Sequence, residues 1–179
     1  MKYQEILNFW FNSETQPFWF AKSDAFDQQL RTRFTDILQQ AKQAELYTWR
    51  ENAAGRLAEI IVLDQFSRNI YRDQATAFAQ DAQALTLAQE AIRLGLDQDL
   101  TAEQRSFLYM PYMHSESKLI HEEALQLFKV LGNPVNLDFE QKHKVIIDRF
   151  GRYPHRNAIL GRESTAEENE FLKQPNSGF

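Results

Sequence analysis

Arginine and histidine gather in one short stretch of a chain that is otherwise acidic. The nine residues from Arg149 to Asn157 contain three arginines and one histidine, although the formal net charge of the chain is −5. Gly151 and Pro154 lie within this stretch and favour a rigid backbone. A rigid loop that presents guanidinium groups is suited to hold a carboxylate or a phosphate. The ligand-binding candidates in the stretch are Arg149, Arg152, Arg156 and Asn157.

The same arginines are compatible with a purely structural role. In that alternative they cap the C-terminal ends of helices and pair with Asp64, Glu116 and Asp148. The two interpretations differ in their consequences for stability, because stranding one partner of a buried ion pair costs about 3–5 kcal/mol. The ligand interpretation predicts that Arg156→Gln changes the melting temperature little.

Histidines near a carboxylate are the candidates for proton transfer. His114 and Glu116 lie two residues apart where a helix is expected to begin, and His155 lies within the arginine stretch. An imidazole can exchange a proton near neutral pH, and a neighbouring carboxylate can orient it. If a reaction occurs, His114 or His155 would transfer the proton, with Glu116 or Asp64 as the orienting carboxylate. In the alternative, Ser115 caps the helix and Glu116 stabilises its positive end.

A third polar group ends the most apolar of the expected helices. Asp64, Arg68 and Arg72 follow one another at intervals of four, so they share a face if the helix continues. One interpretation is an Asp64–Arg68 ion pair that ends the helix, because a buried charge needs a partner. The other is that Asp64, Arg68 and Asn69 contribute to the ligand site.

The two remaining histidines have simpler assignments. His143 shares a helical stripe with Ile147, which predicts a buried histidine with a satisfied hydrogen bond. His121 precedes Glu122 and Glu123 and is predicted to be solvated.

Helices must position all of these residues, because no segment shows the alternation of a strand. Apolar residues recur at helical spacing near residues 2–11, 23–45, 53–66, 75–94, 101–111, 116–131 and 138–150, and a last short helix begins at Thr165. Thr101 opens one helix as an incomplete capping box in which Glu103 lies one position early. A faint repeat at an offset of about 37 residues is similar to the period of helical-hairpin arrays. The sequence therefore predicts one all-α domain over residues 1–179, with antiparallel hairpins stacked in a tetratricopeptide-like array.

Composition removes several classes of function. The chain has no Cys, which excludes disulfides, Cys-ligated zinc, iron–sulfur clusters and a thiol nucleophile, and favours a cytoplasmic location. The negative net charge gives no reason to expect nucleic acid or an anionic membrane. The longest apolar run, Ile60–Leu63, is far too short to cross a bilayer. Without a Gly-rich phosphate loop or a paired metal-ligand spacing, no cofactor and no metal are expected.

The segments that carry these candidates also resemble a known family. They are Phe9–Phe11, Trp19–Phe20, Leu63–Arg72, Phe78–Asp81, Phe107–Pro111, His114–Glu116, Arg149–Asn157 and Gly161–Thr165. Together they resemble a bacterial family catalogued as domain of unknown function 924, across essentially the whole chain. Ser67 stands where the family typically has Pro, and Tyr153 where it often has Phe; neither departure falls on a charged candidate. The resemblance implies an all-α fold similar to tetratricopeptide hairpins, and no activity.

The leading hypothesis from the sequence is a pocket for a small anionic ligand. In this hypothesis the candidates from all three segments lie in one patch, and no motif decides whether a reaction follows. The alternative from another class is a helical-repeat scaffold that binds a peptide or protein partner in its groove. In a third interpretation the polar residues only stabilise the fold.

Overall fold

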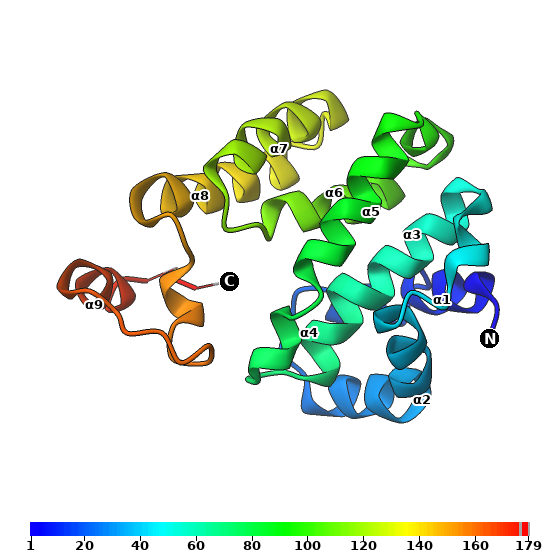
Figure 1. The fold of residues 1–179 in the computed structure, drawn as a ribbon, viewed down its shortest axis with the longest axis horizontal. Helices are drawn as coiled ribbons and strands as arrows, with labels where there is room; N and C mark the ends of the chain where they lie inside the picture. The colour runs from blue at the N-terminus through cyan, green and yellow to red at the C-terminus, as the bar shows by residue number, and fades with distance from the viewer. Residues whose placement is uncertain (176, 179) are drawn as a thin grey trace. The chain divides into compact units, whose positions relative to one another are not determined.

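Helices form all the regular structure of the protein in the residues that the structure describes. The structure, a computed structural model, describes residues 1–175, 177 and 178, and no strand occurs among them (Figure 1). The α-helices are α1 (Tyr3–Trp10), α2 (Asp24–Lys42), α3 (Ala53–Ile61), α4 (Ser67–Ile70), α5 (Asp81–Arg93), α6 (Ala102–Met113), α7 (Lys118–Leu131), α8 (Pro134–Phe150) and α9 (Ala166–Leu172). The 3-10 turns are η1 (Gln16–Phe18), η2 (Tyr47–Glu51), η4 (Ala75–Phe78), η5 (Leu96–Asp99) and η6 (Pro154–Arg156), and η3 (Val62–Phe66) is a π-helix. The all-α prediction is confirmed.

The chain divides into two compact units. Unit 1 comprises Met1–Arg72 and Thr76–Pro111, and unit 2 comprises Asp73–Ala75 and the residues from Tyr112 onward. The boundary falls inside α6, directly after Pro111. The single-domain assignment stays a prediction. No described helix combines the length and apolar character that crossing a bilayer requires.

Aromatic side chains form the core of unit 1. The Phe9 ring lies 4.8 Å from the Phe34 ring, and the Trp10 ring lies 5.6 Å from the Phe66 ring and 5.7 Å from the Phe107 ring. Helix α3 contacts both α1 and α5, and seven of its nine residues are buried. It leads directly into η3 and α4, which pack on α2.

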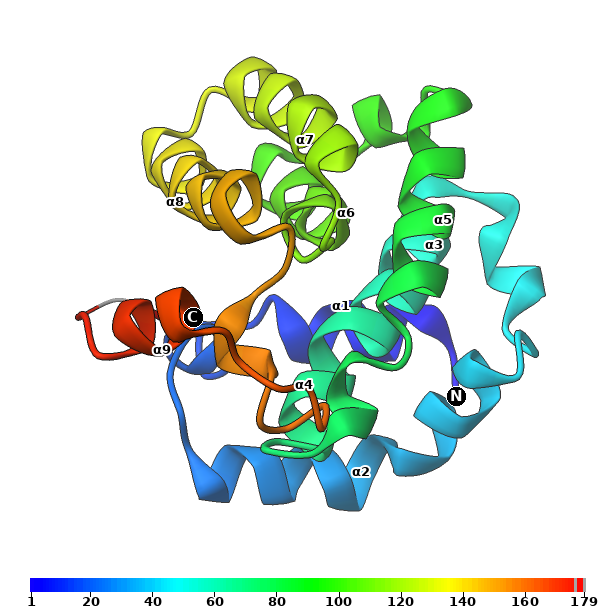
Figure 2. The ribbon, with the colours of Figure 1, turned by 60° about the vertical axis from the view of Figure 1, so that its left-hand side comes forward.

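A helical hairpin, α7 and α8, is the framework of unit 2 (Figure 2). Gly132 ends α7 with a positive φ of 76°, and Asn133 caps α8 by accepting hydrogen bonds from two backbone N–H groups. Gly151 ends α8 in the same left-handed conformation, with a φ of 70°. Beyond it, the buried Tyr153 packs with Ile146 and Ile147 in the core of this unit.

Several helix ends differ from the sequence predictions for local reasons. The segment expected as one helix over 75–94 contains the 3-10 turn η4 and then α5, which begins only at Asp81. Helix α8 begins at Pro134 rather than Asp138, because proline lacks the N–H that the first helical residue leaves unused. The Thr101 capping box is complete, since the Gln104 side chain accepts from the Thr101 N–H at 3.1 Å.

The cap of α7 was also assigned to the wrong serine. Ser117, not Ser115, has the extended backbone of an N-cap and accepts from the N–H of Ile120. The helix therefore begins two residues later than expected, which leaves His114 and Glu116 in the connection before it. Both side chains are thereby available to other partners.

Candidate functional site

Tyr153 is the centre of a polar cluster in unit 2. The residue is fully buried, and its backbone N–H donates to Glu116 Oε1 at 2.7 Å. Its backbone oxygen accepts from Arg162 Nη2 at 3.2 Å. Gly151 makes this position reachable, because its left-handed backbone ends α8 and redirects the chain.

Glu116 and Arg162 form a two-pronged ion pair beside Tyr153. Arg162 donates to the two Glu116 oxygens at 2.6 and 2.9 Å, and its Nε donates to Asn157 Oδ1 at 2.9 Å. Partial burial alone would raise the pKa of Glu116, but hydrogen bonds from Arg162 and Tyr153 and the positive charges of Arg156 and Arg162 lower it. Glu116 is therefore an ionised acceptor that holds the cluster together. Asn157 is a structural bridge, since its Nδ2 donates to Ser164 Oγ at 3.0 Å.

Arg156 and His155 lie against the Tyr153 ring. The Arg156 guanidinium lies 4.6 Å from the centre of that ring, and Nη2 donates to the His114 carbonyl at 3.1 Å. The side chain is only 6% exposed. The His155 ring lies 5.5 Å from the Tyr153 ring and is partly exposed. His155 and Arg156 thus meet around one aromatic side chain, and Arg156 connects them to the backbone of His114.

His121 was predicted to be solvated, and this prediction is wrong. Its side chain is 0% exposed; Nδ1 lies 2.7 Å from Glu140 Oε1, and Nε2 lies 2.9 Å from the Ser115 carbonyl oxygen. The neighbouring glutamates do face solvent, but successive residues of a helix point about 100° apart. The informative pattern was the buried stripe of His121, Ala124 and Phe128, at spacings of three and four.

The hydroxyl of Tyr153 completes this buried set. It lies 3.1 Å from His121 Nε2 and donates to the Met113 carbonyl at 2.5 Å. A phenylalanine at this position would lack both contacts. Sequence comparison with Phe does not reveal the contacts of the Tyr153 hydroxyl, because these contacts depend on the tertiary structure.

His143 is a core histidine, as predicted. Its Nδ1 lies 2.7 Å from the Phe139 carbonyl oxygen, so this nitrogen carries the hydrogen. Burial, together with the smaller effect of the charges of His114, His121 and Arg156, lowers the pKa of His143 to about 3, although the hydrogen bond to Phe139 acts in the opposite direction.

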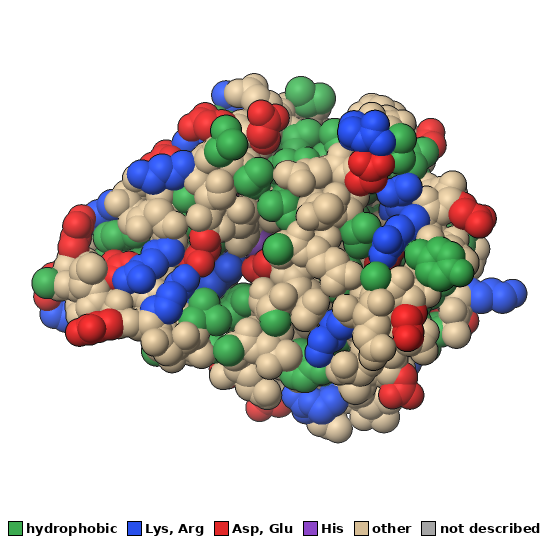
Figure 3. Space-filling model, in the orientation of Figure 1, with side chains coloured by type: hydrophobic (Ala, Val, Ile, Leu, Met, Phe, Trp, Pro, Cys, Tyr) green, Lys and Arg blue, Asp and Glu red, His purple; other side chains and the backbone are tan. Residues whose placement is uncertain are grey.

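The two outer arginines of the stretch are held by glutamates of α9. Arg149 Nε lies 2.7 Å from Glu167 Oε1, with both side chains largely exposed, and Arg152 donates to both oxygens of Glu168 at 2.6 and 2.7 Å. Figure 3 shows positive and negative side chains interspersed over α8 and α9. The structural alternative is right that such arginines pair with carboxylates, but Asp64, Glu116 and Asp148 were the wrong partners for them. The pairing of Glu168 with Arg152 was not predicted, because in the sequence Glu168 is typical of the capping box that begins α9.

Asp64, Arg68 and Asn69 belong to unit 1. The Asp64–Arg68 ion pair is confirmed, with 3.0 Å between Arg68 Nη1 and Asp64 Oδ1. Arg68 also donates to both carboxylate oxygens of Asp81, at 2.8 and 3.0 Å. Arg72 does not share this face, because α4 ends at Ile70. Both Arg72 and Asn69 bind Asp27 of α2 instead. The expectation that the candidates of both units form one patch stays a prediction.

Two kinds of chemistry are available to the cluster of unit 2. Guanidinium and imidazole groups can donate to the oxygens of an anion, and a partly exposed imidazole can transfer a proton. Within residues 1–175, 177 and 178, no group of three His, Asp or Glu side chains is arranged to hold a metal ion.

The protein is all-helical in its described residues, and carboxylate–arginine ion pairs hold the connections between its last helices. Residues 6–176 match the family described as a bacterial protein of unknown function, DUF924, and the chain belongs to that family. A solved structure of a protein of unknown function from Agrobacterium tumefaciens is 39% identical, covers 96% of each chain and superposes with a TM-score of 0.91. No curated protein matches the chain. The resemblance predicted from the sequence motifs is confirmed.

Proposed function

We propose that the protein binds a small anionic ligand at the cluster formed by His114, His155 and Arg156 in unit 2. The observation that carries this proposal is that His155 and Arg156 both lie against the Tyr153 ring, while Arg156 also donates to the backbone carbonyl of His114. Burial is the main reason for the low pKa of His143, but the charge of Arg156 contributes to it, and that charge would attract an anion. A ligand with a carboxylate or phosphate group fits such donors.

The candidate residues outside the proposed binding cluster have structural roles of two kinds. Arg68, Arg149 and Arg152 already bind carboxylates, so we assign them to the stability of their units. Glu116, Asn157 and the backbone of Tyr153 form the support on which the donors are held. If a reaction accompanies binding, His155 is the proton-transfer group, since its imidazole is partly exposed.

Thermal unfolding in sulfate tests the proposal. A ligand that binds only the folded state stabilises it by RT ln(1 + [L]/Kd), about 2.7 kcal/mol at a concentration of a hundred times Kd. We expect sodium sulfate to raise the melting temperature more than sodium chloride at equal ionic strength, and His155→Gln to reduce that difference. Arg149→Gln is the matched control, because it removes a positive charge from the nearby last turn of α8 at an exposed position. Equal effects of the two salts on the wild type would refute anion binding.

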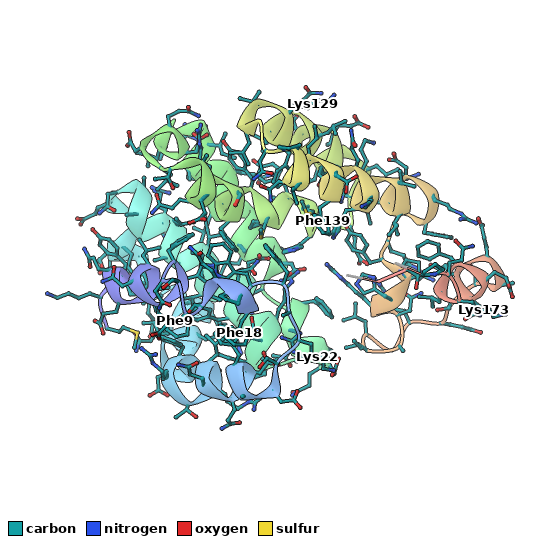
Figure 4. The ribbon with its side chains drawn as sticks, turned by 180° about the vertical axis from the view of Figure 1, so that it is seen from behind. Phe9, Phe18, Lys22, Lys129, Phe139 and Lys173 are labelled. Carbon is teal, nitrogen blue, oxygen red and sulfur yellow. The ribbon has the colours of Figure 1, made fainter. Side chains whose placement is uncertain are left out.

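A second candidate function is a helical scaffold for a peptide or protein partner. It is favoured by exposed apolar side chains on the α7–α8 hairpin, Leu119, Val130, Val135, Phe139 and Val145. Figure 4 shows Phe139 projecting from α8. A hairpin array of the tetratricopeptide kind and a cytoplasmic location belong to this proposal as well. Replacing Val130 and Val135 with Ser would leave sulfate binding intact and abolish association with such a partner.

A further inference from the structure

The hydrogen bonds of His121 fix where its protons lie. The Ser115 carbonyl oxygen, 2.9 Å from Nε2, can only accept, so Nε2 carries a hydrogen. The Tyr153 hydroxyl donates its own hydrogen to Met113 O, which leaves the hydroxyl oxygen to accept from the same Nε2–H at 3.1 Å. This assignment rests on the geometry of the acceptors.

One further proton must lie between His121 and Glu140. Because Nε2 is protonated, the 2.7 Å contact between Nδ1 and Glu140 Oε1 requires a hydrogen on one of these two atoms. The pair is then either imidazolium with carboxylate or imidazole with carboxylic acid, and both forms are neutral overall. Loss of that proton would set a carboxylate against a nitrogen lone pair in a fully buried site.

The charged groups around the His121–Glu140 pair do not remove the need for the shared proton. Burial raises the pKa of Glu140, and the hydrogen bond and charge of His121 only partly offset that effect. On α8, Lys144 lowers and Asp148 raises the pKa of Glu140, and these two residues also pair with each other.

Tyr153 connects the buried pair to the proposed binding cluster. Its hydroxyl contacts His121, its backbone holds Glu116 and Arg162, and its ring supports Arg156. A tyrosine ring is rigid, so fixing the hydroxyl at one end also fixes the ring beneath the guanidinium at 4.6 Å.

We infer that Glu140 and His121 are positioning residues for the anion-binding cluster and act on it through the Tyr153 hydroxyl. The inference rests on the proposed function for its ligand, but the geometry of the relay can be measured without a ligand. It predicts that any change which keeps a hydrogen bond to His121 Nδ1 preserves the cluster. It also predicts that a change which removes that bond displaces Arg156 and the histidines.

Two substitutions of Glu140 and one of Tyr153 provide the test. Glu140→Gln keeps a hydrogen bond, because the Gln amide donates to Nδ1 of a neutral imidazole. Glu140→Leu has a similar size but removes the bond, and Tyr153→Phe breaks the relay at its other end while it keeps the ring. Glu122→Gln is the matched control on an exposed position of α7.

The first readout is the difference in melting temperature between sulfate and chloride. A general loss of stability appears in both salts and cancels in this difference. We expect Glu140→Gln and Glu122→Gln to keep the wild-type difference, and Tyr153→Phe and Glu140→Leu to lose most of it. If Glu140→Leu does not fold, Tyr153→Phe carries the comparison.

The second readout is the set of imidazole nitrogen signals in NMR spectra without added sulfate. We expect the His114 and His155 signals to shift in Tyr153→Phe and Glu140→Leu and to stay in place in Glu140→Gln. Unchanged signals in both disruptive variants would overturn the positioning role. If these signals shift but the wild type shows no sulfate effect, the relay stands and the proposed ligand class fails.

Discussion

The ring, backbone and hydroxyl of Tyr153 each contact different partners, so its contribution to the cluster cannot be predicted from the residue type alone. The ring supports a guanidinium, the backbone binds Glu116 and Arg162, and the hydroxyl reaches a buried histidine. A sequence identifies charged residues as candidates, but it does not reveal an aromatic residue that arranges them. His121 was misjudged for a related reason, since its partner Glu140 lies on another helix, 19 positions away.

Arg156 should matter for stability, in contrast to the expectation from sequence that Arg156→Gln has little effect. The guanidinium is 6% exposed, lies over the Tyr153 ring and donates to a carbonyl oxygen. Loss of a desolvated cation–π contact and a charge-assisted hydrogen bond costs about 2–4 kcal/mol. Urea unfolding should show that loss for Arg156→Gln and a change within about 0.5 kcal/mol for Arg149→Gln, as for other exposed positions. Equal effects of the two substitutions would contradict the packing of Arg156.

Glu168 should make stability depend on acid pH. Its hydrogen bond with Arg152 lowers the pKa of Glu168 from 4.5 to about 2 in the folded state. Since the folded pKa lies below the unfolded value, the stabilisation is present above pH 4.5 and is lost as the pH falls toward 2. We expect Glu168→Gln to flatten the dependence of the unfolding free energy on pH in that window. Glu167→Gln, at an exposed position, should leave the slope unchanged.

At the scale of elements, most helices were predictable from apolar spacing and from glycine. Gly95, Gly132 and Gly151 each follow a helix and have positive φ values of 71°, 76° and 70°. The π-helix at Val62–Phe66 was not predictable, because its five residues are all buried and leave no amphipathic pattern. The first residues of α7 and α8 depend on which Ser or Asn side chain accepts a hydrogen bond from a backbone N–H. The sequence offers more than one suitable capping residue near these positions.

Gly55 in the first turn of α3 should be intolerant of alanine. Alanine normally stabilises a helix interior by about 1 kcal/mol relative to glycine. Here a Cβ atom would lie 1.9 Å from the carbonyl oxygen of Trp49, so one backbone segment would have to move. We expect Gly55→Ala to lower the melting temperature strongly, by the equivalent of more than about 2 kcal/mol. A stabilised variant would show that η2 does not pack on α3 in this way.

Ser67 should tolerate the loss of its hydroxyl. It follows the π-helix, is fully buried, and its Oγ makes no hydrogen bond to any described residue. An unsatisfied buried hydroxyl costs about 1–3 kcal/mol, so Ser67→Ala should leave stability unchanged or raise it by roughly 1 kcal/mol. Differential scanning calorimetry measures this directly. A large decrease would mean that the hydroxyl has a polar partner in solution.

At the scale of the whole molecule, the candidates separate according to the unit that holds them. Asp64, Arg68 and Asn69 stabilise unit 1, whereas His114, His155 and Arg156 meet in unit 2. Sequence motifs could not separate these sets, because every motif combined charged residues with a helix end. Membership of the DUF924 family fixes the fold and leaves the activity to be established from the site.

The most direct test of anion binding is a sulfate titration of the wild-type protein followed by NMR at constant ionic strength. Anion binding at this cluster predicts saturable shifts that centre on the imidazole signals of His114 and His155 and on the guanidinium signal of Arg156. The backbone signals of unit 1 around Arg68 should stay in place. Shifts that increase linearly without saturation, or that centre on another part of the chain, would contradict anion binding at the cluster.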